Sequence, residues 1–379
     1  MRYRKKKQKK MNRLKNAIFT LQSKKTVISI CKHIGLFKDL ALQVDLVKNI
    51  LNCEILKKYP LPLIYQRNLI CEIVKIIESA GDEVSDELYM HLSQLMGSCH
   101  SNLVSHIIIT FPNNQTDICL NSSNLVNSGN FVFGFEECNL VGMRPWSAGY
   151  RLVEWLIHSV NLGRNVANSD LIELGSGIGI SSIIPYSVLP IKSICSTDHD
   201  PKIINNLRYN FEINGILLNS EFEEHAKSNS NKKYARVMCL DWETININIA
   251  KEILKPLKNP IIISSDVIYD NDLTLLFVRT LRFFLSSCHE KKFGSYHKKC
   301  ISKDPKNKSV KWDELQEADF GSMSTYAISV NTVRNQHTIQ YFVDCCIENG
   351  LTISRDSKVI PMIFNIELDT PTVIFIISY

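Results

Sequence analysis

The fold is decided by one short stretch of the chain, Glu173-Leu174-Gly175-Ser176-Gly177-Ile178-Gly179. Residues 170–174 form a short apolar run that predicts a strand, and the apolar spacing over 178–189 predicts a helix with Pro185 in its interior, which favours a kink or an early end. Glycines between a strand and a helix permit a tight turn and let a ligand lie against bare backbone. The stretch therefore indicates a cofactor loop in a doubly wound α/β domain.

The glycine spacing narrows the class of cofactor. A dinucleotide fold prefers G-x-G-x-x-G, with a pyrophosphate at the helix N-terminus. Here the spacing is G-x-G-x-G, and Glu173 stands two residues before Gly175. S-adenosylmethionine carries an ammonium and a sulfonium group but no phosphate, so an acid beside the loop suits it. The spacing favours S-adenosylmethionine and argues against a nicotinamide oxidoreductase.

Strands and helices alternate on both sides of this loop, which predicts a mostly parallel sheet covered on both faces. We expect a seven-strand domain over 141–379. Its expected strands are 170–174, 192–197, 236–240, 260–265, 324–330, 351–354 and 372–378, and its helices 152–158, 178–189, 201–214, 273–285 and 336–348. Two polar segments, 221–233 and 289–311, read as surface insertions.

Three polar or aromatic residues follow the predicted strands at the edge where such folds bind ligands. Asp198 ends the second strand, and a carboxylate there can accept both ribose hydroxyls, although a helix cap is the alternative. Its neighbour Asp200 is the fallback for the ribose role, but it is expected to cap the helix that Pro201 opens. Asp241 and Trp242 follow the third strand, where a carboxylate can meet the adenine amino group and an aromatic ring its face. For Trp242, core packing is an equal alternative.

The region before 141 has a different character. Apolar spacing over 61–96, broken at Gly81, predicts two helices, and Ser85 predicts an N-cap for the second. Residues 103–110 and 131–135 are rich in β-formers and predict a hairpin. We therefore expect residues 26–140 to form a smaller helical and β-hairpin region.

The first residues are strongly basic. Residues 1–15 contain nine Lys or Arg and no acid, and without them the net charge of +6 becomes −3. Such a run is typical of a solvated arm, so residues 1–25 are expected to be a disordered tail. A nuclear signal, a weak nucleic-acid contact and a mitochondrial leader are the alternatives. The run is rich in Lys where such leaders favour Arg and Ser, and we expect no nucleic-acid partner.

Composition excludes several classes of protein. The 45% hydrophobic and 22% charged content is that of an ordinary globular protein. No apolar run reaches 18 residues, and no secretory signal is visible, so we expect a cytoplasmic protein without a membrane span. The 12 cysteines form no C-x-x-C pair and the 10 histidines no H-x-x-x-H pair, so no metal site is expected.

Four segments together resemble the class I protein-lysine methyltransferases, and most closely the branch that acts on elongation factor 2. They are Val141–Ala148 with Trp146, the Glu173–Gly179 loop, Leu240-Asp241-Trp242, and the D-x-x-Y signature in Ser265-Asp266-Val267-Ile268-Tyr269. Leu61–Tyr65, Asp86–Tyr89 and Thr332–Asn335 are similar to the elongation factor 2 branch.

This resemblance implies a role for each matching residue. Trp146 would join Glu173, the three glycines, Asp198, Asp241 and Trp242 in binding S-adenosylmethionine. Asp266 would orient the acceptor amine and Tyr269 would line the acceptor site; a helix cap and plain core packing are their alternatives. The substrate would be a lysine of elongation factor 2, and the enzyme a monomer.

Two departures bear on the substrate. Ser147 stands where the family often has an acid, so any role of that acid is missing. The N-P-P-[YF] signature of amino-methylating enzymes is absent from 265–269, which argues against adenine or glutamine acceptors. Three rival functions stay open: transfer to another protein lysine, transfer to RNA or a small molecule, and a methyltransferase-like binding module without activity.

Overall fold

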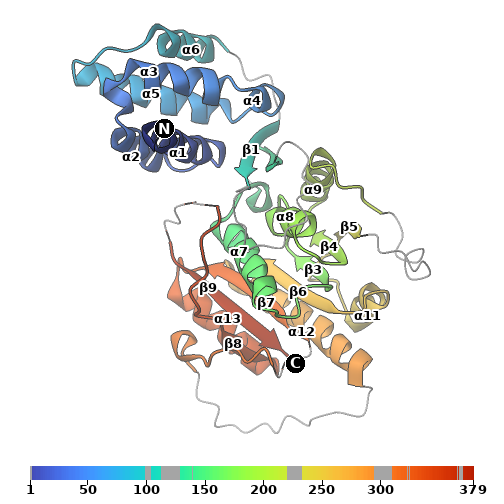
Figure 1. The fold of residues 1–379 in the computed structure, drawn as a ribbon. Helices are drawn as coiled ribbons and strands as arrows, with labels where there is room; N and C mark the ends of the chain where they lie inside the picture. The colour runs from blue at the N-terminus through green and yellow to red at the C-terminus, as the bar shows by residue number, and fades with distance from the viewer. Residues whose placement is uncertain are drawn as a thin grey trace. The chain divides into compact units, whose positions relative to one another are not determined.

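The computed structural model describes residues 2–98, 104–111, 129–138, 140–219, 233–293, 310–321, 323, 325–364, 366 and 370–379. The chain divides into two compact units (Figure 1). Unit 1 comprises Met1–Asn113, Asn127–Asn139 and Met362–Glu367; unit 2 comprises Asn114–Val126, Leu140–Pro361 and Leu368–Tyr379.

Unit 2 is built on a seven-stranded sheet in the order β5-β4-β3-β6-β7-β9-β8. All pairings are parallel except those of β9, which runs antiparallel to both of its neighbours. The strands are β3 (Asp170–Leu174), β4 (Ser193–Asp198), β5 (Tyr234–Cys239), β6 (Pro260–Ser265), β7 (Ala327–Thr332), β8 (Thr352–Arg355) and β9 (Thr372–Ser378). This order, with its single reversed strand, confirms the predicted class I methyltransferase fold.

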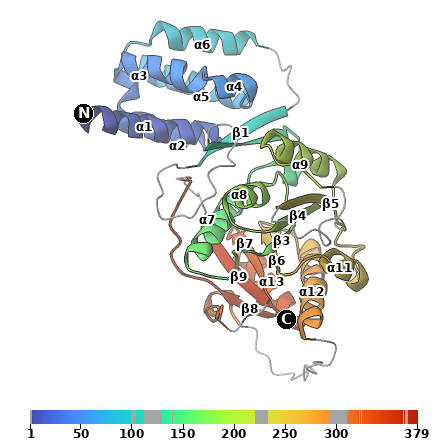
Figure 2. The same cartoon turned by 45° about the vertical axis from the view of Figure 1, so that its right-hand side comes forward.

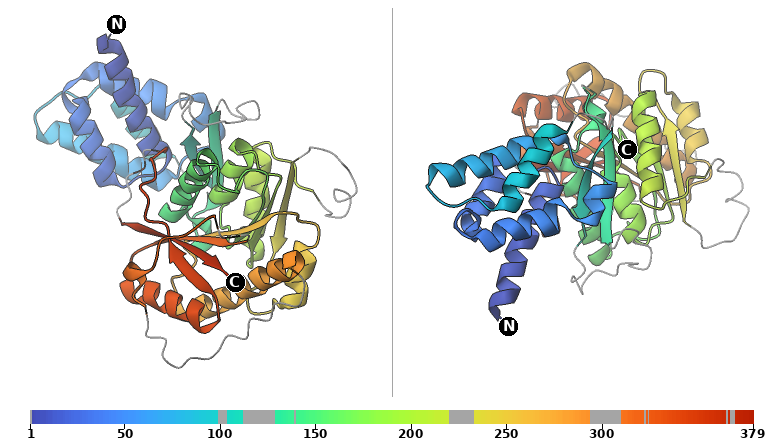
Figure 3. Two further views of the ribbon diagram at one scale, coloured as in Figure 1. Left: turned by 60° about the horizontal axis from the view of Figure 1, so that its bottom comes forward. Right: turned by 90° about the horizontal axis from the view of Figure 1, so that it is seen from above.

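Helices cover both faces of this sheet (Figures 2 and 3). One layer contains α7 (Ser147–Asn161), α8 (Ile180–Val188) and α9 (Pro201–Ile213), and the other contains α11 (Ile247–Leu254), α12 (Asn271–Phe293) and α13 (Gln336–Glu348). Short 3₁₀ turns lie at Val141–Met143 and Trp312–Glu314. The rings of Phe277, Phe342 and Phe375 stack through the core between the sheet and the second layer, with centroids 6.0 and 5.5 Å apart.

The topology places a ligand site at the centre of this sheet. Strand β3 lies between β4 and β6, so the chain leaves it first toward one edge and later returns to the other. Ligands of open α/β sheets bind at the carboxyl ends of the strands beside such a switch point. The glycine loop follows β3 directly and therefore stands at that point.

Unit 1 is mainly helical and carries the expected hairpin. Its helices are α1 (Arg2–Phe19), α2 (Lys24–Ile34), α3 (Leu40–Asp45), a π-helical segment at Leu46–Leu51, α4 (Glu54–Lys58), α5 (Leu63–Ser79) and α6 (Asp86–Gly97), with a 3₁₀ turn at Leu36–Lys38. Strands β1 (Val104–Thr110) and β2 (Asn130–Glu136) pair antiparallel. Ser85 caps α6 as expected, since its hydroxyl accepts a bond from the Leu88 N–H. Residues 112–128, between these two strands, lie outside the described residues.

The basic N-terminus differs from the expected disordered tail. Residues Arg2–Phe19 form α1, and Met11, Leu14 and Ile18 are buried. These three residues recur at three- and four-residue spacing, so they make one apolar stripe that packs in unit 1. The prediction for 1–25 was wrong because it weighed the charges of 1–15 and overlooked this stripe, whereas Lys9 and Lys10 are exposed as expected.

Two smaller differences concern surface segments. Helix α11 was not predicted, because its buried positions, Ala250, Ile253 and Leu254, span little more than one turn. Helix α12 continues to Phe293 and so takes in the start of the expected 289–311 insertion. Residues 220–232 and 294–309 lie outside the described residues. No described helix is long and apolar enough to cross a membrane.

The packing of α1 yields a stability prediction. Ile18 is completely buried, so Ile18→Ala should destabilise unit 1 by about 2–5 kcal/mol, the usual cost of such a truncation. Because α1 contacts β1, amide hydrogen exchange across Val104–Thr110 should speed up in the variant. The exposed residue Lys10 supplies the control, Lys10→Ala, which should leave exchange unchanged. Equal exchange in Ile18→Ala and wild type would show that α1 does not hold the unit together.

Candidate functional site

The glycines of the loop pack closely against other segments of the chain. Gly175, Gly177 and Gly179 all adopt left-handed conformations, with φ of 73°, 52° and 92°. A Cβ on Gly175 would lie 2.8 Å from Val267 Cγ1, and one on Gly177 would lie 2.9 Å from the carbonyl oxygen of Gly142. The loop therefore requires glycine for conformation and for space. These contacts also bring the loop against the 141–148 segment and the D-x-x-Y segment.

Glu173 braces the helix that follows the loop. Its carboxylate is fully buried, and its two oxygens accept bonds from the hydroxyls of Ser181 and Ser182 in the first turn of α8. Burial raises the pKa of Glu173 to about 7, although the serine hydrogen bonds oppose this shift. The sequence placed this acid beside the cofactor; in the structure its carboxylate is engaged by α8.

Asp198 faces the loop from the end of β4. Its Oδ2 accepts a bond of 3.1 Å from the Gly177 N–H, and its Oδ1 accepts one of 2.8 Å from the His199 N–H. Helix α9 is capped by Asp200 instead, through a 2.7 Å bond from the Lys202 N–H. The carboxylate of Asp198 thus stands beside the loop and leaves the capping role to Asp200.

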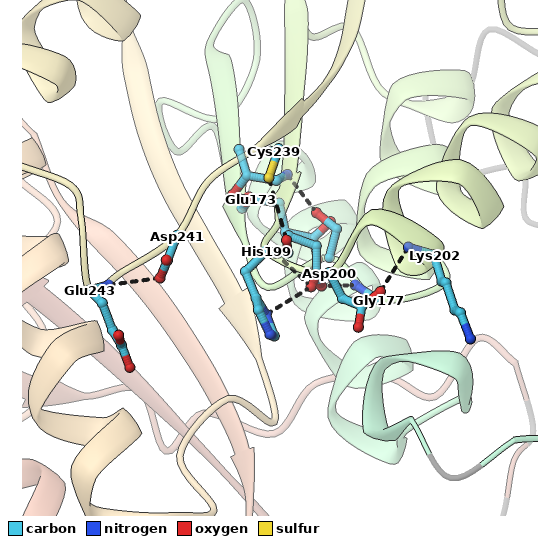
Figure 4. Close-up of polar contacts among 11 residues, drawn as sticks. Glu173, Gly177, His199, Asp200, Lys202, Cys239, Asp241 and Glu243 are labelled. Atoms are coloured by element: carbon cyan, nitrogen blue, oxygen red, sulfur yellow. Dashed lines mark hydrogen bonds and ion pairs between the residues drawn. The ribbon is translucent and has the colours of Figure 1, made fainter.

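Acids gather around the exposed His199 side chain at the ends of β4 and β5 (Figure 4). Its Nδ1 lies 3.5 Å from Asp198 Oδ1, and this contact is the main cause that raises the pKa of His199. The charges of Asp200 and Asp241 raise it further. Asp241 Oδ1 accepts a 2.9 Å bond from the Glu243 N–H, which fixes the turn after β5. This side of the site is therefore negatively charged.

Trp242 packs in the core and also lies at the loop. Its ring centroid is 5.2 Å from that of Phe277, and its ring atoms would lie 3.5 Å from a Cβ on Gly175. The side chain is half-buried. Trp242 thus packs against the core and also borders the loop, and its expected contact with the adenine ring stays a prediction.

Asp266 holds three segments together at the carboxyl end of β6. Its side chain is buried, and its backbone is left-handed, with φ of 53°. Oδ1 accepts a 2.7 Å bond from the Thr332 N–H; Oδ2 accepts bonds from the Thr332 hydroxyl at 2.9 Å, Arg334 Nη2 at 3.2 Å and the Ala148 N–H at 3.4 Å. Helix α12 is capped by Asp270, through the Leu273 N–H at 3.0 Å, so Asp266 does not have the capping role that was its alternative.

Trp146 lies beside Asp266 through its contact with Arg334. The indole N–H of Trp146 donates a 3.0 Å bond to the carbonyl of Val141. The guanidinium carbon of Arg334 lies 4.9 Å from the centre of the Trp146 ring, within the range of a cation–π contact. In the sequence, Arg334 stands out only as part of the Thr332–Asn335 likeness, which implies no role for it. Its place directly after a strand at the ligand-binding edge was the available signal.

Tyr269 completes the group. Its side chain is half exposed, at 50%, so it is not a core residue. Burial of its other half raises the pKa of Tyr269, and the charges of Asp198 and Asp270 raise it further. Tyr269, which follows β6, therefore lies close enough to the end of β4 for the charge of Asp198 to act on it. Among the described residues, no group of His, Cys, Asp and Glu is placed to hold a metal ion.

Comparison with known proteins agrees with the fold. Residues 135–306 match a protein family described as lysine methyltransferase. An uncharacterized protein of Dictyostelium discoideum is 31% identical over 45% of this chain, and the match spans 49% of that protein's length. The human protein-lysine N-methyltransferase EEF2KMT is 24% identical over 66% of this chain and 69% of its own length. The chain is thus similar to class I protein-lysine methyltransferases, whose cofactor is S-adenosylmethionine.

Solved structures add little to what the strand order shows. Pyrococcus horikoshii TYW2 in complex with MeSAdo is 12% identical over 66% of this chain and 69% of its own, with a TM-score of 0.34. The human methyltransferase 10 domain containing protein is 11% identical over 62% of this chain and 83% of its own, also with a TM-score of 0.34.

The buried Glu173 yields a prediction about pH. Its pKa in the fold is about 7, above the ordinary 4.5, so the stability that its protonated form contributes is present in full below pH 4.5 and is lost as pH rises through 7. Glu173→Gln cannot ionise. We expect it to become more stable relative to wild type between pH 5 and pH 8.

Urea unfolding followed by tryptophan fluorescence measures this difference, because all four tryptophans lie in unit 2. Glu243→Gln changes an exposed acid in the same unit and should run parallel to wild type at both pH values. Parallel curves for Glu173→Gln and wild type would show that Glu173 does not titrate in this range.

Proposed function

We propose that this chain transfers a methyl group from S-adenosylmethionine to a lysine side chain of a protein. One observation carries the proposal: the glycine loop packs against the D-x-x-Y segment, since Gly175 has no room for a side chain beside Val267. A cofactor held at the loop would then have Asp266 and Tyr269 as its neighbours. The likeness to lysine methyltransferases favours a lysine acceptor.

The residues around the loop fit the cofactor. The left-handed glycines keep side chains out of the loop, and the carboxylate of Asp198, which accepts a bond from the Gly177 N–H, would accept ribose hydroxyls. Asp241 and Trp242 would hold the adenine, and Trp146 would close the site from the α7 side. When bound, S-adenosylmethionine supplies an electrophilic methyl group. The acids at the β4 and β5 ends suit a cofactor that carries two positive groups and one carboxylate.

The acceptor must first lose a proton, because an ammonium group has no lone pair. With an ordinary lysine pKa near 10.4, this costs roughly 4–5 kcal/mol at pH 7. Burial of the amine and a neighbouring positive charge lower the cost, since both disfavour the ammonium form. The protein then has mainly to orient the amine.

Asp266 and Tyr269 would provide that orientation. A carboxylate oxygen can accept about two hydrogen bonds, and from the described residues Asp266 Oδ1 accepts one, from the Thr332 N–H. The second acceptor position of this oxygen would take a hydrogen bond from the lysine amine, or from a water molecule that removes the proton of the lysine ammonium. The half-exposed ring of Tyr269 would line the path of the lysine side chain.

We propose elongation factor 2 as the substrate, methylated by a cytoplasmic monomer. The core of the site is common to lysine methyltransferases of this fold, so it cannot select a target. A folded substrate needs a larger docking surface, typically about 800 Å² per partner. Helix α6 of unit 1 exposes Tyr89, Met90 and Met96 and would contribute to such a surface. The likeness of Asp86–Tyr89 to the elongation factor 2 branch supports this choice.

The substrate can be tested directly. Purified enzyme and methyl-labelled S-adenosylmethionine are incubated with elongation factor 2 from a strain that lacks this enzyme, and mass spectrometry locates the label. We expect label on one lysine of the factor, and none when factor from the normal strain is used. Label on another lysate protein, with the factor unlabelled, would refute the substrate but keep the lysine chemistry. Label on RNA alone would refute both.

The cofactor loop can be tested with a matched pair of glycines. Gly177 and Gly163 both have left-handed backbones, but a Cβ on Gly163 would meet nothing within 4 Å. Both alanine variants therefore carry a similar backbone strain, about 1–2 kcal/mol, and only Gly177→Ala disturbs the loop. We expect calorimetry to show S-adenosylmethionine binding weakened at least ~10-fold in Gly177→Ala and unchanged in Gly163→Ala. Equal affinities of the two variants would refute the assignment of the cofactor site to this loop.

A further inference from the structure

Arg334 stands between two residues of the candidate site. Its guanidinium donates to Asp266 Oδ2 at 3.2 Å and lies over the ring of Trp146 at 4.9 Å. The residue follows β7 and immediately precedes Asn335, the cap of α13, and its own N–H bonds the carbonyl of Thr332 at 2.9 Å. The base of this side chain is therefore fixed at the ligand-binding edge of the sheet.

The ion pair with Asp266 does not by itself explain why an arginine stands at position 334. The Asp266 carboxylate already accepts bonds from the Thr332 N–H, the Thr332 hydroxyl and the Ala148 N–H. Three neutral donors therefore already engage this buried carboxylate, and Arg334 is an additional partner. The Asp266 side chain is 2% exposed, whereas that of Arg334 is 46% exposed. Arg334 thus reaches from a buried anchor into solvent.

Most of the guanidinium remains available to a ligand. An arginine side chain carries five N–H donors in a planar fork, and toward the described residues Arg334 uses one of them, on Asp266. Its contact with Trp146 uses the face of the group and not its edge donors. Two contacts hold the plane in place, so little further entropy is lost when a partner binds.

We propose that Arg334 selects the substrate by pairing with an acidic side chain that lies beside the acceptor lysine. The inference rests on the proposed transfer to a protein lysine. A fixed guanidinium recognises a carboxylate through two parallel hydrogen bonds, which gives both affinity and direction. A lysine without an acidic neighbour would bring a like charge to this cation and gain no pairing in return, so such lysines are disfavoured.

The pairing also fits the proton requirement of the acceptor. A carboxylate beside the lysine stabilises the ammonium form in the free substrate. Once Arg334 engages that carboxylate, the lysine loses its stabilising partner as it enters the site. Arg334 would then act on the substrate before transfer, and not on the cofactor. The competing assignment is a contact between Arg334 and the carboxylate of S-adenosylmethionine.

A charge-reversal cycle tests the proposal. Labelled S-adenosylmethionine and lysate from a strain lacking the enzyme first identify the methylated lysine by mass spectrometry, whichever protein carries it. Each acidic residue flanking that lysine is then changed to lysine in the purified substrate. Every substrate is assayed with wild type, Arg334→Glu and Arg334→Lys, and S-adenosylmethionine affinity is measured separately by calorimetry.

We expect Arg334→Glu to raise KM for the protein at least ~10-fold, the scale of a close charge pair at an interface, with cofactor affinity unchanged. One reversed substrate should restore activity with Arg334→Glu while losing it with wild type. Arg334→Lys should be intermediate, because it keeps the charge but not the fork. The control Lys251→Glu reverses an exposed cation on α11 and should show no such coupling.

Each other outcome has a definite meaning. Additive effects of Arg334→Glu with every reversed substrate would overturn the proposal, as would weakened S-adenosylmethionine binding in Arg334→Glu, which would assign the residue to the cofactor. A labelled protein other than elongation factor 2 would refute only the proposed substrate, because the cycle runs on that protein. Label on RNA alone would overturn this inference together with the proposed function.

Discussion

The site depends on a stretch of backbone that tolerates no side chain. Gly175 and Gly177 are left-handed, and each meets another segment where a Cβ would be, Val267 in one case and the Gly142 carbonyl in the other. Close packing of bare backbone is what brings segments distant in sequence to one edge. The surrounding bonds keep the loop in place: Asp198 accepts from the Gly177 N–H, and Glu173 holds the first turn of α8.

Asp266 is the corresponding constraint on the other side of the site. A left-handed conformation costs a non-glycine residue about 1–2 kcal/mol, so it persists only where the surroundings offset it. The donors from Thr332, Ala148 and Arg334 provide that compensation. The same bonds tie β6 to β7 and to the start of α7. One carboxylate therefore both offsets the strain at this position and fixes the arrangement of the candidate acceptor site.

The sequence predicted the elements whose signals are local. Strands β3, β6 and β9 and helix α13 begin and end where expected, because apolar runs there are bounded by polar or turn residues. Helix α1 was missed because its apolar stripe lies among lysines that dominate the composition. The place of Arg334 at the ligand-binding edge had a local signal. The engagement of Glu173 by α8 and the contacts of Arg334 with Asp266 and Trp146 had none, since each depends on side chains that only the folded chain brings together.

The charges at the edge of the sheet differ from one end to the other. Asp198, Asp200 and Asp241 gather at the ends of β4 and β5, whereas Arg334 projects from the end of β7. On the proposed function, the acids face a cofactor that carries a sulfonium and an ammonium, and the cation faces the incoming substrate. Attraction at a few ångströms is far stronger between partly buried groups than in bulk water. The acidic neighbour of the acceptor lysine would therefore guide the substrate toward Arg334. A lysine without such a neighbour would gain no attraction there.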